Sequence, residues 1–189
     1  MSSDVLAIIA RHDPTRWTGT LRRRAKIDLP FDASRVPEGA PLLFDTTVYI
    51  DQLKGDLPRA IVSLISSRTI FHATPALAEI AVAVGALNPT DERTKHTLKP
   101  ILETLERIPL QRVISPPNET WLEAAVIAGI LARTQGFAKE ARRKFLNDTL
   151  LFLMAAESGT ILISRNSRDI DLLLQMRPGV GVLLYQKRT

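Results

Sequence analysis

Residues 42–53 read LLFDTTVYIDQL, and this stretch decides the fold that we expect for the chain. Its first three residues are apolar, which is enough for a short buried strand, and the apolar positions after Asp45 and Thr46 suit a helix. An acid at the carboxyl end of a buried strand, just before a helix, lies where open α/β sheets bind ligands. Asp is also a common helix cap, so Asp45 is at this point either a cap or a ligand.

The rest of the chain continues to alternate between short apolar strands and amphipathic helices. Further strands are predicted at residues 68–73, 112–115, 160–164 and 180–185. Helices are predicted at residues 57–67, 74–87, 91–107, 118–133, 147–158 and 170–175. Strands that are separated by helices indicate a parallel sheet with helices on both faces. We therefore expect an α/β domain over residues 41–189.

Residues 1–40 do not follow this pattern. Apart from a short helix predicted at 5–10, proline and glycine interrupt the segment, so we expect an irregular or helical N-terminal extension. The run Arg22–Lys26 (RRRAK) is the densest basic cluster of the chain. It is either a solvated surface or an arm that contacts phosphate groups, and the sequence leaves both interpretations open.

Composition limits the possible classes of protein. The 189 residues are 45% hydrophobic and 24% charged, which is typical of an ordinary globular domain. The chain has no cysteine, which excludes disulfides, thiolate catalysis and cysteine-ligated zinc. The net charge of +5 permits a polyanionic partner. No secretory signal is recognisable and no apolar run reaches the roughly 18 residues of a membrane helix, so we expect a cytoplasmic protein without a membrane partner.

Four acids occupy corresponding positions in the alternation of strands and helices: Asp45, Glu79, Asp148 and Asp169. In a parallel sheet all four are expected on the side of the carboxyl ends of the strands. Carboxylates that are confined together repel each other and need a cation to stay ionised. Oxygen ligands without cysteine favour Mg²⁺ or Mn²⁺ over zinc, and such an ion can activate water and orient a phosphodiester.

Each acid also has a simpler interpretation. Asp148 could be a charge at the start of the helix predicted at 147–158, Glu79 could be a solvated helical residue, and Asp169 could be a loop acid. Glu79 and Asp148 nevertheless stand among apolar residues, where charges are rarely left unpaired.

The quoted stretch and two later segments together resemble a known family. FDTTVYID (residues 44–51) resembles the opening motif of PIN-domain ribonucleases, in particular of VapC-type toxins, and PALAEI (75–80) resembles their second motif. NDTLLFLMAAESGTILISRNSRDI (147–170) resembles the third and fourth motifs. Ser164 stands where the family usually has Thr, and Ile170 where it has Phe. The resemblance extends over residues 41–189 and finds no counterpart for residues 1–40.

The resemblance implies roles for single residues. Asp45, Glu79, Asp148 and Asp169 match the acidic quartet of the family; Asp45 and Asp148 are the expected direct ligands of Mg²⁺ or Mn²⁺, with Asp169 as a further metal residue. Glu79 and Asp169 complete the cluster or hold metal-bound waters. Thr46 matches the hydroxyl residue beside the first acid, and Asn166 matches the Asn that positions the loop of the fourth motif.

Three arginines are candidates for substrate binding. Arg165 lies beside Asn166 at the expected rim of the site. Arg142 and Arg143 precede Asp148 and could guide an RNA backbone, but a solvated helix face explains them equally well. His72 lies in an apolar strand and is expected to be structural.

The family also implies a fold and a function. The fold is a PIN-like three-layer sandwich with a central, mostly parallel sheet that is flanked by helices. The expected activity is that of a metal-dependent endoribonuclease, acting as the toxin of a type II toxin–antitoxin pair, with RNA as substrate, a cognate antitoxin as partner and a homodimer as the assembly. A housekeeping RNA-processing nuclease without an antitoxin and a non-catalytic RNA-binding module of the same fold are the alternatives.

Overall fold

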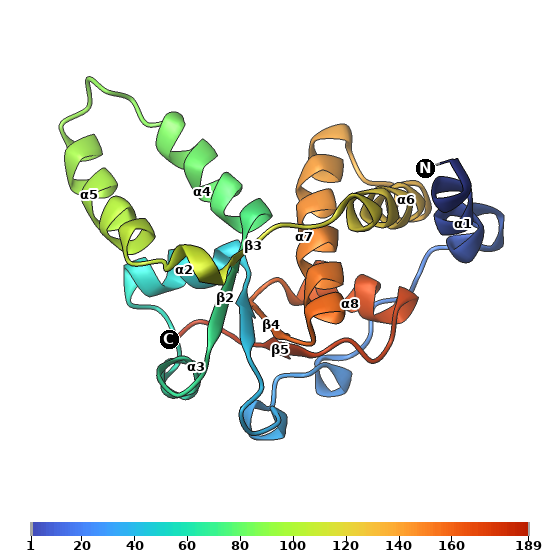
Figure 1. Ribbon diagram of the computed structural model, residues 1–189, viewed down its shortest axis with the longest axis horizontal. Helices are drawn as coiled ribbons and strands as arrows, with labels where there is room; N and C mark the ends of the chain where they lie inside the picture. Colours follow the sequence, from blue (N-terminus) through green and yellow to red (C-terminus); the bar gives the residue numbers. More distant parts are fainter. Residues whose placement is uncertain (1, 189) are drawn as a thin grey trace.

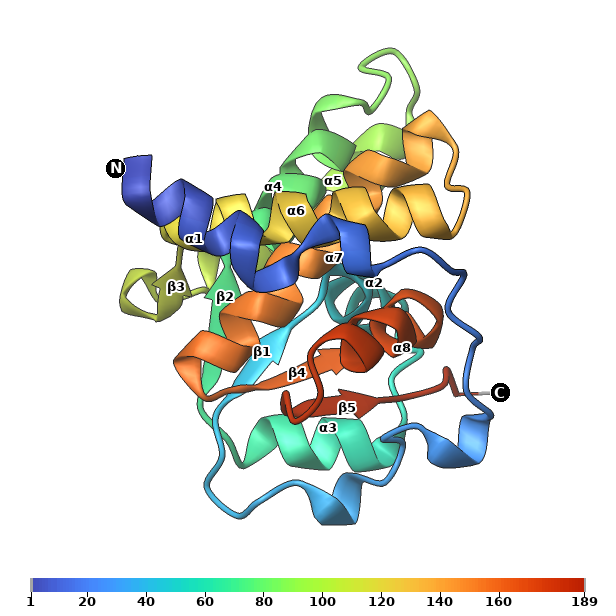
Figure 2. The same cartoon turned by 90° about the vertical axis from the view of Figure 1, so that its right-hand side faces the viewer.

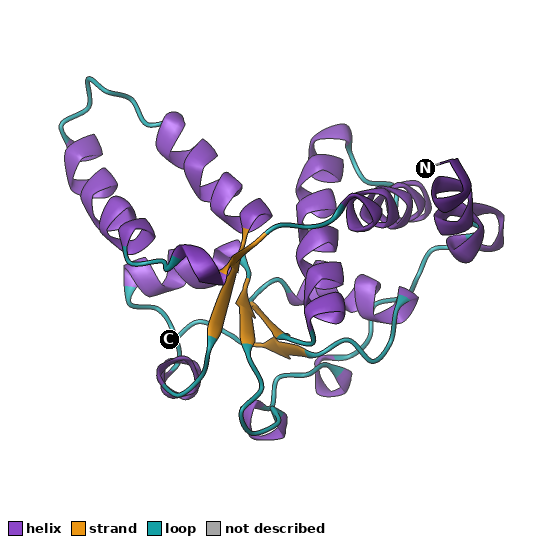
Figure 3. Cartoon of the chain, in the orientation of Figure 1, coloured by secondary structure: helices purple, strands orange, loops and turns teal. Residues whose placement is uncertain are grey.

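Strand β1 (Leu42–Phe44) lies in the middle of the sheet, and its three side chains are buried. The computed structural model describes residues 2–188 and shows an α/β fold with helices on both faces of the sheet (Figure 1, Figure 3). Within these residues the sheet has five strands in the order β3-β2-β1-β4-β5, and all neighbours are parallel. The predicted α/β sandwich is confirmed, and its sheet is parallel throughout.

The remaining strands coincide with the predicted ones but are shorter. They are β2 (Ile70–Ala73), β3 (Val113–Ile114), β4 (Ile161–Ser164) and β5 (Val182–Leu184). The two central strands are paired so that Leu42 lies opposite Ile161 and Phe44 opposite Ile163. This register brings the residues that follow β1 and β4 to the same edge of the sheet, which is where ligands bind in open α/β sheets.

The helices pack in layers against this sheet. They are α1 (Ser2–His12), α2 (Thr46–Lys54), α3 (Arg59–Ser66), α4 (Thr74–Gly85), α5 (Arg93–Glu106), α6 (Asn118–Thr134), α7 (Lys139–Ser158) and α8 (Ser167–Met176). Helices α2 and α3 lie on one side of the sheet, and α7 and α8 lie on the other (Figure 1). Helix α6 packs against α7, and α1 packs against α6. None of the helices within residues 2–188 is both long and apolar enough to cross a membrane.

Helix α7 is longer than predicted, and its length changes the position of Asp148. We expected a helix over residues 147–158 with Asp148 at its start, but α7 begins at Lys139 and has 20 residues. Its first turns are exposed and rich in Lys, Arg and Glu, which favour helix without giving an apolar period. Asp148 therefore lies in the helix interior, and its interpretation as a charge at a helix N-terminus is wrong. Gly159 ends the helix in the left-handed conformation, which glycine adopts without steric cost.

Helices α4 and α5 form a hairpin that projects from the body of the molecule (Figure 1). Although α4 is strongly apolar, its buried residues lie in its first seven positions, and Val82 further along is 72% exposed. Helix α5 continues through Pro100, which lies in its interior.

The chain between α1 and β1, residues 13–40, is called here the N-terminal arm. It runs from the end of α1 past α8 and then below β5 and α3 (Figure 2). Thr20 Oγ1 donates a hydrogen bond to the carbonyl oxygen of Thr134, and the amide of Leu184 donates to the carbonyl oxygen of Pro30 at 2.7 Å. The arm is thus attached to α6 and to the outer strand β5.

The hydrophobic core lies between the sheet and the helices on its two faces, with α7 on one side and α2 and α3 on the other, and Leu162 of β4 is one of its fully buried residues. We expect Leu162→Ala to lower the free energy of unfolding by about 2–5 kcal/mol, because the truncation removes buried methyl groups and leaves a cavity. Leu110→Ala is the matched control, since Leu110 is 86% exposed. Urea denaturation of both variants measures the difference; similar stability of the two variants would contradict the central position of β4.

Candidate active site

Asp45 follows β1 directly and lies where β1 and β4 end. It is 4% exposed, and its carboxylate accepts hydrogen bonds from the amide of Thr47 at 3.4 Å and from Thr47 Oγ1 at 2.9 Å, which makes it the N-cap of α2. Ser164, the last residue of β4, also donates to Asp45 through its hydroxyl. The cap interpretation of Asp45 is therefore confirmed. It does not exclude a ligand role, because the same carboxylate lies at the carboxyl edge of the sheet.

Asn166 connects the third and the fourth acid. Its side-chain amide Nδ2 donates to Asp148 Oδ2 at 3.0 Å and to Asp169 Oδ2 at 2.9 Å. Its Oδ1 accepts a hydrogen bond from the amide of Asp169 at 3.3 Å and so caps α8. Asp148 is 5% exposed, whereas Asp169 lies in the first turn of α8. The loop between β4 and α8 is thus fixed against α7 by one side chain.

Glu79 approaches the same region from α4. It accepts hydrogen bonds from the hydroxyl of Thr46 and from Asn147 Nδ2, the latter at 3.0 Å. Thr46 is the chain neighbour of Asp45, and Asn147 is the chain neighbour of Asp148. The interpretation of Glu79 as a solvated helical residue is therefore wrong. The structure brings all four predicted acids, together with Thr46 and Asn166, to one edge of the sheet.

The acids influence each other's ionisation. The pKa of Asp148 is raised well above the usual value of an Asp, first because burial penalises the charged form and then because Asp45, Asp169 and Glu79 repel its charge. Burial also raises the pKa of Asp45, against the hydrogen bonds from Ser164 and Thr47, which favour the charged form. A cation in this region would relieve the repulsion.

The oxygen donors of this cluster fit a hard divalent ion such as Mg²⁺ or Mn²⁺. Their present arrangement is not a finished coordination sphere, since no group of three or more His, Asp or Glu side chains within residues 2–188 is placed to hold a metal ion. The carboxylates instead accept hydrogen bonds from neighbouring side chains, and the amide of Asn166 lies between Asp148 and Asp169. The chemistry of the donors supports a metal site, while the positions of the side chains do not by themselves define one.

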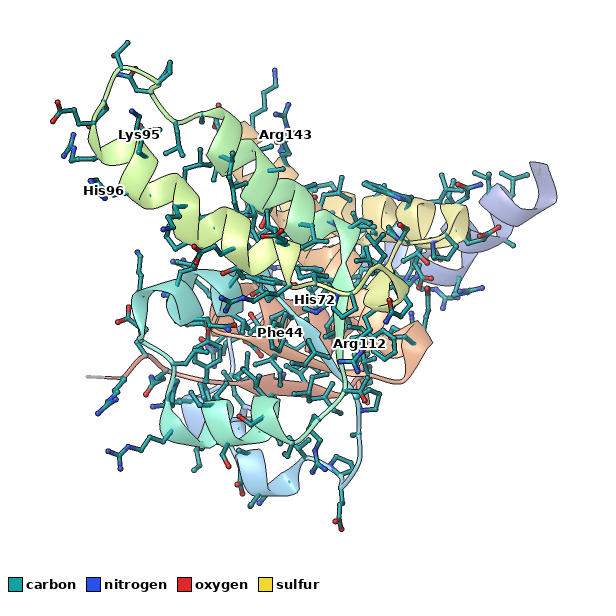
Figure 4. The ribbon with its side chains drawn as sticks, turned by 60° about the vertical axis from the view of Figure 1, so that its left-hand side comes forward. Phe44, His72, Lys95, His96, Arg112 and Arg143 are labelled. Carbon is teal, nitrogen blue, oxygen red and sulfur yellow. The ribbon has the colours of Figure 1, made fainter. Side chains whose placement is uncertain are left out.

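The predicted arginines are not joined to the acids. Arg165 Nε donates to Asp51 Oδ2 at 2.7 Å, so its guanidinium is engaged by another, fully buried carboxylate. Arg142 Nε donates to the carbonyl oxygen of Phe137, and Arg143 lies at the outer end of α7 (Figure 4). Within residues 2–188 no hydrogen bond or ion pair connects these three arginines to the four acids.

His72 belongs to strand β2, and its imidazole ring has a structural partner. Its Nδ1 is 2.6 Å from the hydroxyl oxygen of Tyr49, and its ring packs edge-on against Phe44 (Figure 4). Burial lowers the pKa of His72 to about 4, so the ring is neutral at pH 7. The expectation of a structural histidine agrees with these contacts.

Several residues that support the site were not predicted as site residues. Ser164 and Thr47 orient Asp45, Asn147 binds Glu79, and Asp51 fixes Arg165. Ser164 had a recognisable signal, because it follows an apolar strand within the fourth motif. Thr47 is also local, since it lies two residues after Asp45 in the capped start of α2. The contacts of Asn147 and Asp51 instead join segments that are distant in sequence, which no local pattern contains.

Comparisons with known proteins agree with this fold. No protein-family model matches the sequence, and no curated protein matches it. Among solved structures, VapBC2 from Rickettsia felis bound to a promoter DNA fragment is similar with a TM-score of 0.52 and 12% identity, covering 77% of this chain and 99% of that chain. DNA-bound VapBC from Salmonella typhimurium has a TM-score of 0.51 and 17% identity, and the match covers 76% of this chain and 96% of that chain. FitAcB from Neisseria gonorrhoeae has a TM-score of 0.50 and 18% identity, and the match covers 75% of this chain and 96% of that chain.

At these identities the likeness establishes the fold. The chain has a PIN-like α/β fold, of the kind found in VapBC structures, as its motifs predicted.

The close approach of the acids should lower the stability of the folded protein. Because the pKa of Asp148 is raised in the folded protein, its protonated form is favoured there, and the folded state loses relative stability as the pH rises through the raised pKa. In EDTA at pH 7 we expect Asp148→Asn to be more stable than wild type, with a rise in Tm of about 2–4 °C for each kcal/mol of relieved repulsion. The difference should shrink toward pH 4, near the pKa of an Asp in an unfolded chain.

Thermal denaturation followed by circular dichroism between pH 4 and 8 measures this difference. Asp28→Asn is the matched control, because Asp28 is exposed on the N-terminal arm. A wild type that is more stable than Asp148→Asn at pH 7 in EDTA would contradict the proposed repulsion.

Proposed function

We propose that the protein is a Mg²⁺- or Mn²⁺-dependent endoribonuclease. The observation that carries this proposal is the burial of Asp45 and Asp148 beside Asp169 and Glu79 at the carboxyl edge of the parallel sheet. The four acids converge from the end of β1 and from α4, α7 and α8, and their mutual repulsion destabilises the folded state. A binding site for a cation explains why such acids are brought together. The PIN-like fold supports a nuclease of this kind.

The chain's own residues have distinct tasks in this proposal. Asp45, Asp148 and Asp169 would hold the cation, and Glu79 completes the acidic cluster. Ser164 orients the carboxylate of Asp45, and Asn166 keeps the β4–α8 loop close to α7. A divalent ion, when bound, supplies neutralisation of phosphate charge and orientation of water for hydrolysis of a phosphodiester. The basic excess of the chain favours a polyanionic substrate such as RNA.

We further propose that the protein is the toxin of a type II toxin–antitoxin pair and that it forms a homodimer. Support for an antitoxin comes from two of the similar solved structures, which are named VapBC2 and VapBC and are both bound to DNA. Support for a dimer comes from the projecting hairpin, where α4 leaves Ala81, Val82 and Ala83 exposed. An apolar helical surface of this kind is a common protein–protein contact.

The nuclease proposal predicts a specific loss of activity. With labelled single-stranded RNA and Mg²⁺ or Mn²⁺, wild type should cut internally, and Asp45→Asn should lower the rate by about 100-fold or more, since a lost ligand costs several kcal/mol of transition-state stabilisation. EDTA should stop the reaction. Gel electrophoresis of the products measures the rate.

The control is again Asp28→Asn, which makes the same chemical change at an exposed position. It should cut like wild type. If wild type cuts no faster than Asp45→Asn, the protein is not this nuclease.

The partner proposal is tested with the reading frame adjacent to the gene. We expect a small adjacent frame to encode a protein that co-purifies with this chain and lowers its RNA cleavage at least tenfold, because a tightly bound partner covers the acidic edge. Pull-down and cleavage assays with the co-expressed pair measure both effects. A neighbouring protein that neither binds nor inhibits would favour a nuclease without an antitoxin.

A further inference from the structure

The basic run of the N-terminal arm is anchored to α8 by Arg24. The backbone amide of Arg24 donates to Asp171 Oδ2 at 3.0 Å, and its Nε donates to Asp171 Oδ1 at 2.6 Å. Asp171 is 2% exposed, so this ion pair is well shielded from water on the acid's side. Gln175 Nε2 adds a hydrogen bond to the carbonyl oxygen of Arg22 at 3.2 Å. Residues 22–24 are therefore fixed along α8, where the arm passes that helix (Figure 2).

This anchoring places the guanidinium of Arg23 next to the acidic cluster. Arg23 Nη2 lies 3.9 Å from Asp169 Oδ1, close enough for electrostatic attraction but too far for a hydrogen bond. Its other terminal nitrogen, Nη1, is buried and has no hydrogen-bond partner within residues 2–188. The side chain of Arg23 as a whole is 32% exposed, so a ligand can reach the guanidinium from solvent. An unpaired buried donor of a charged group costs free energy, and a ligand that pairs with this guanidinium offsets part of that cost.

The neighbouring arginines do not share this property. The guanidinium of Arg24 is engaged by Asp171, and that of Arg165 is engaged by Asp51. Arg23 alone among these three leaves a buried terminal nitrogen without a partner within the described residues. Its guanidinium stays charged at all physiological pH values and presents a planar fork of donors, which matches two oxygens of a phosphate group.

We propose that Arg23 binds a phosphate group of the RNA strand at the acidic edge, so that the N-terminal arm completes the substrate site. This inference rests on the proposed nuclease function and adds to it a residue from outside the segment that carries the acidic motifs. Arg24 is a positioning residue, which holds the arm on Asp171 and thereby aims Arg23. A contact with phosphate positions the strand without reading its sequence.

The geometry favours substrate binding over a plug that blocks the site. A blocking arginine would pair directly with the acids, as Arg24 pairs with Asp171. Arg23 instead stops short of hydrogen-bond distance from Asp169, and within residues 2–188 it makes no ion pair with Asp45 or Asp148.

The test compares single charge removals on adjacent residues. Wild type, Arg23→Ala, Arg23→Lys and the matched control Arg22→Ala are titrated with fluorescein-labelled single-stranded RNA in EDTA, and binding is followed by fluorescence anisotropy at several salt concentrations. Arg22 suits the control because it is exposed and carries the same charge one residue away.

We expect Arg23→Ala to weaken binding by roughly tenfold or more, as loss of a hydrogen-bonded charge pair does. The slope of log affinity against log salt should fall in magnitude by about 0.7, the value for one phosphate contact to a single strand. Arg23→Lys should recover part of the affinity, and Arg22→Ala should change it less than threefold. Single-turnover cleavage in Mg²⁺ should show the same order.

Thermal denaturation distinguishes a loss of RNA binding from a loss of folded structure in these variants. Arg23→Ala should melt close to the wild-type temperature, because Nη1 has no partner to lose within residues 2–188 and the attraction to Asp169 acts over 3.9 Å between partly exposed groups. Arg24→Ala should melt lower, since it removes the ion pair of the buried Asp171, which within residues 2–188 then keeps hydrogen bonds only from the amide of residue 24 and from Gln175.

Equal effects of Arg23→Ala and Arg22→Ala would overturn the inference, and so would a lower melting temperature of Arg23→Ala that accounts for its weaker binding. Tighter binding or faster cleavage by Arg23→Ala would show that the arm inhibits the site, which also overturns it. In all of these outcomes wild type remains an active nuclease. Failure of the nuclease proposal is different, because wild type itself then cuts no faster than Asp45→Asn.

Discussion

The hydrogen bond from Ser164 to Asp45 is the contact on which the rest of the site depends. It joins the ends of the two central strands, β1 and β4, whose parallel register places these residues at one edge of the sheet. The amide of Asp45 also donates to the carbonyl oxygen of Ile163 at 3.1 Å, so backbone and side chain both fix the acid. Because β1 and β4 are buried and paired, Asp45 has little freedom to move. The other acids assemble around this fixed point.

The carboxylates of the candidate site repel each other, and the folded state would be more stable without this repulsion. Burial and mutual repulsion raise the pKa of Asp148, and a chain selected for stability alone would carry an uncharged residue there. The amide of Asn166 offsets part of this cost by donating to both Asp148 and Asp169. Such a conflict between stability and local charge is typical of functional sites.

Two neighbouring arginines in the basic run of the N-terminal arm have different surroundings. Arg24 forms a close ion pair with the buried Asp171, whereas Arg23 lies 3.9 Å from Asp169 and has one buried nitrogen, Nη1, without a partner within residues 2–188. The sequence presents these arginines as equivalent, since both belong to the same run. Their different surroundings arise because the arm crosses α8 with a fixed register, and Asp169 and Asp171 are two residues apart on that helix.

The sequence by itself determined the parallel α/β fold and the four acids, because apolar strand length, helical period and the position of an acid after a strand are local properties of the chain. It misplaced the start of α7, since exposed helix formers show no apolar period, and so it gave Asp148 the wrong position within its helix. Only the tertiary structure decided that Asn166 joins two acids, that Asp51 engages Arg165, and that Arg23 reaches the site. These contacts join segments far apart in sequence, and their geometry depends on strand register and helix packing.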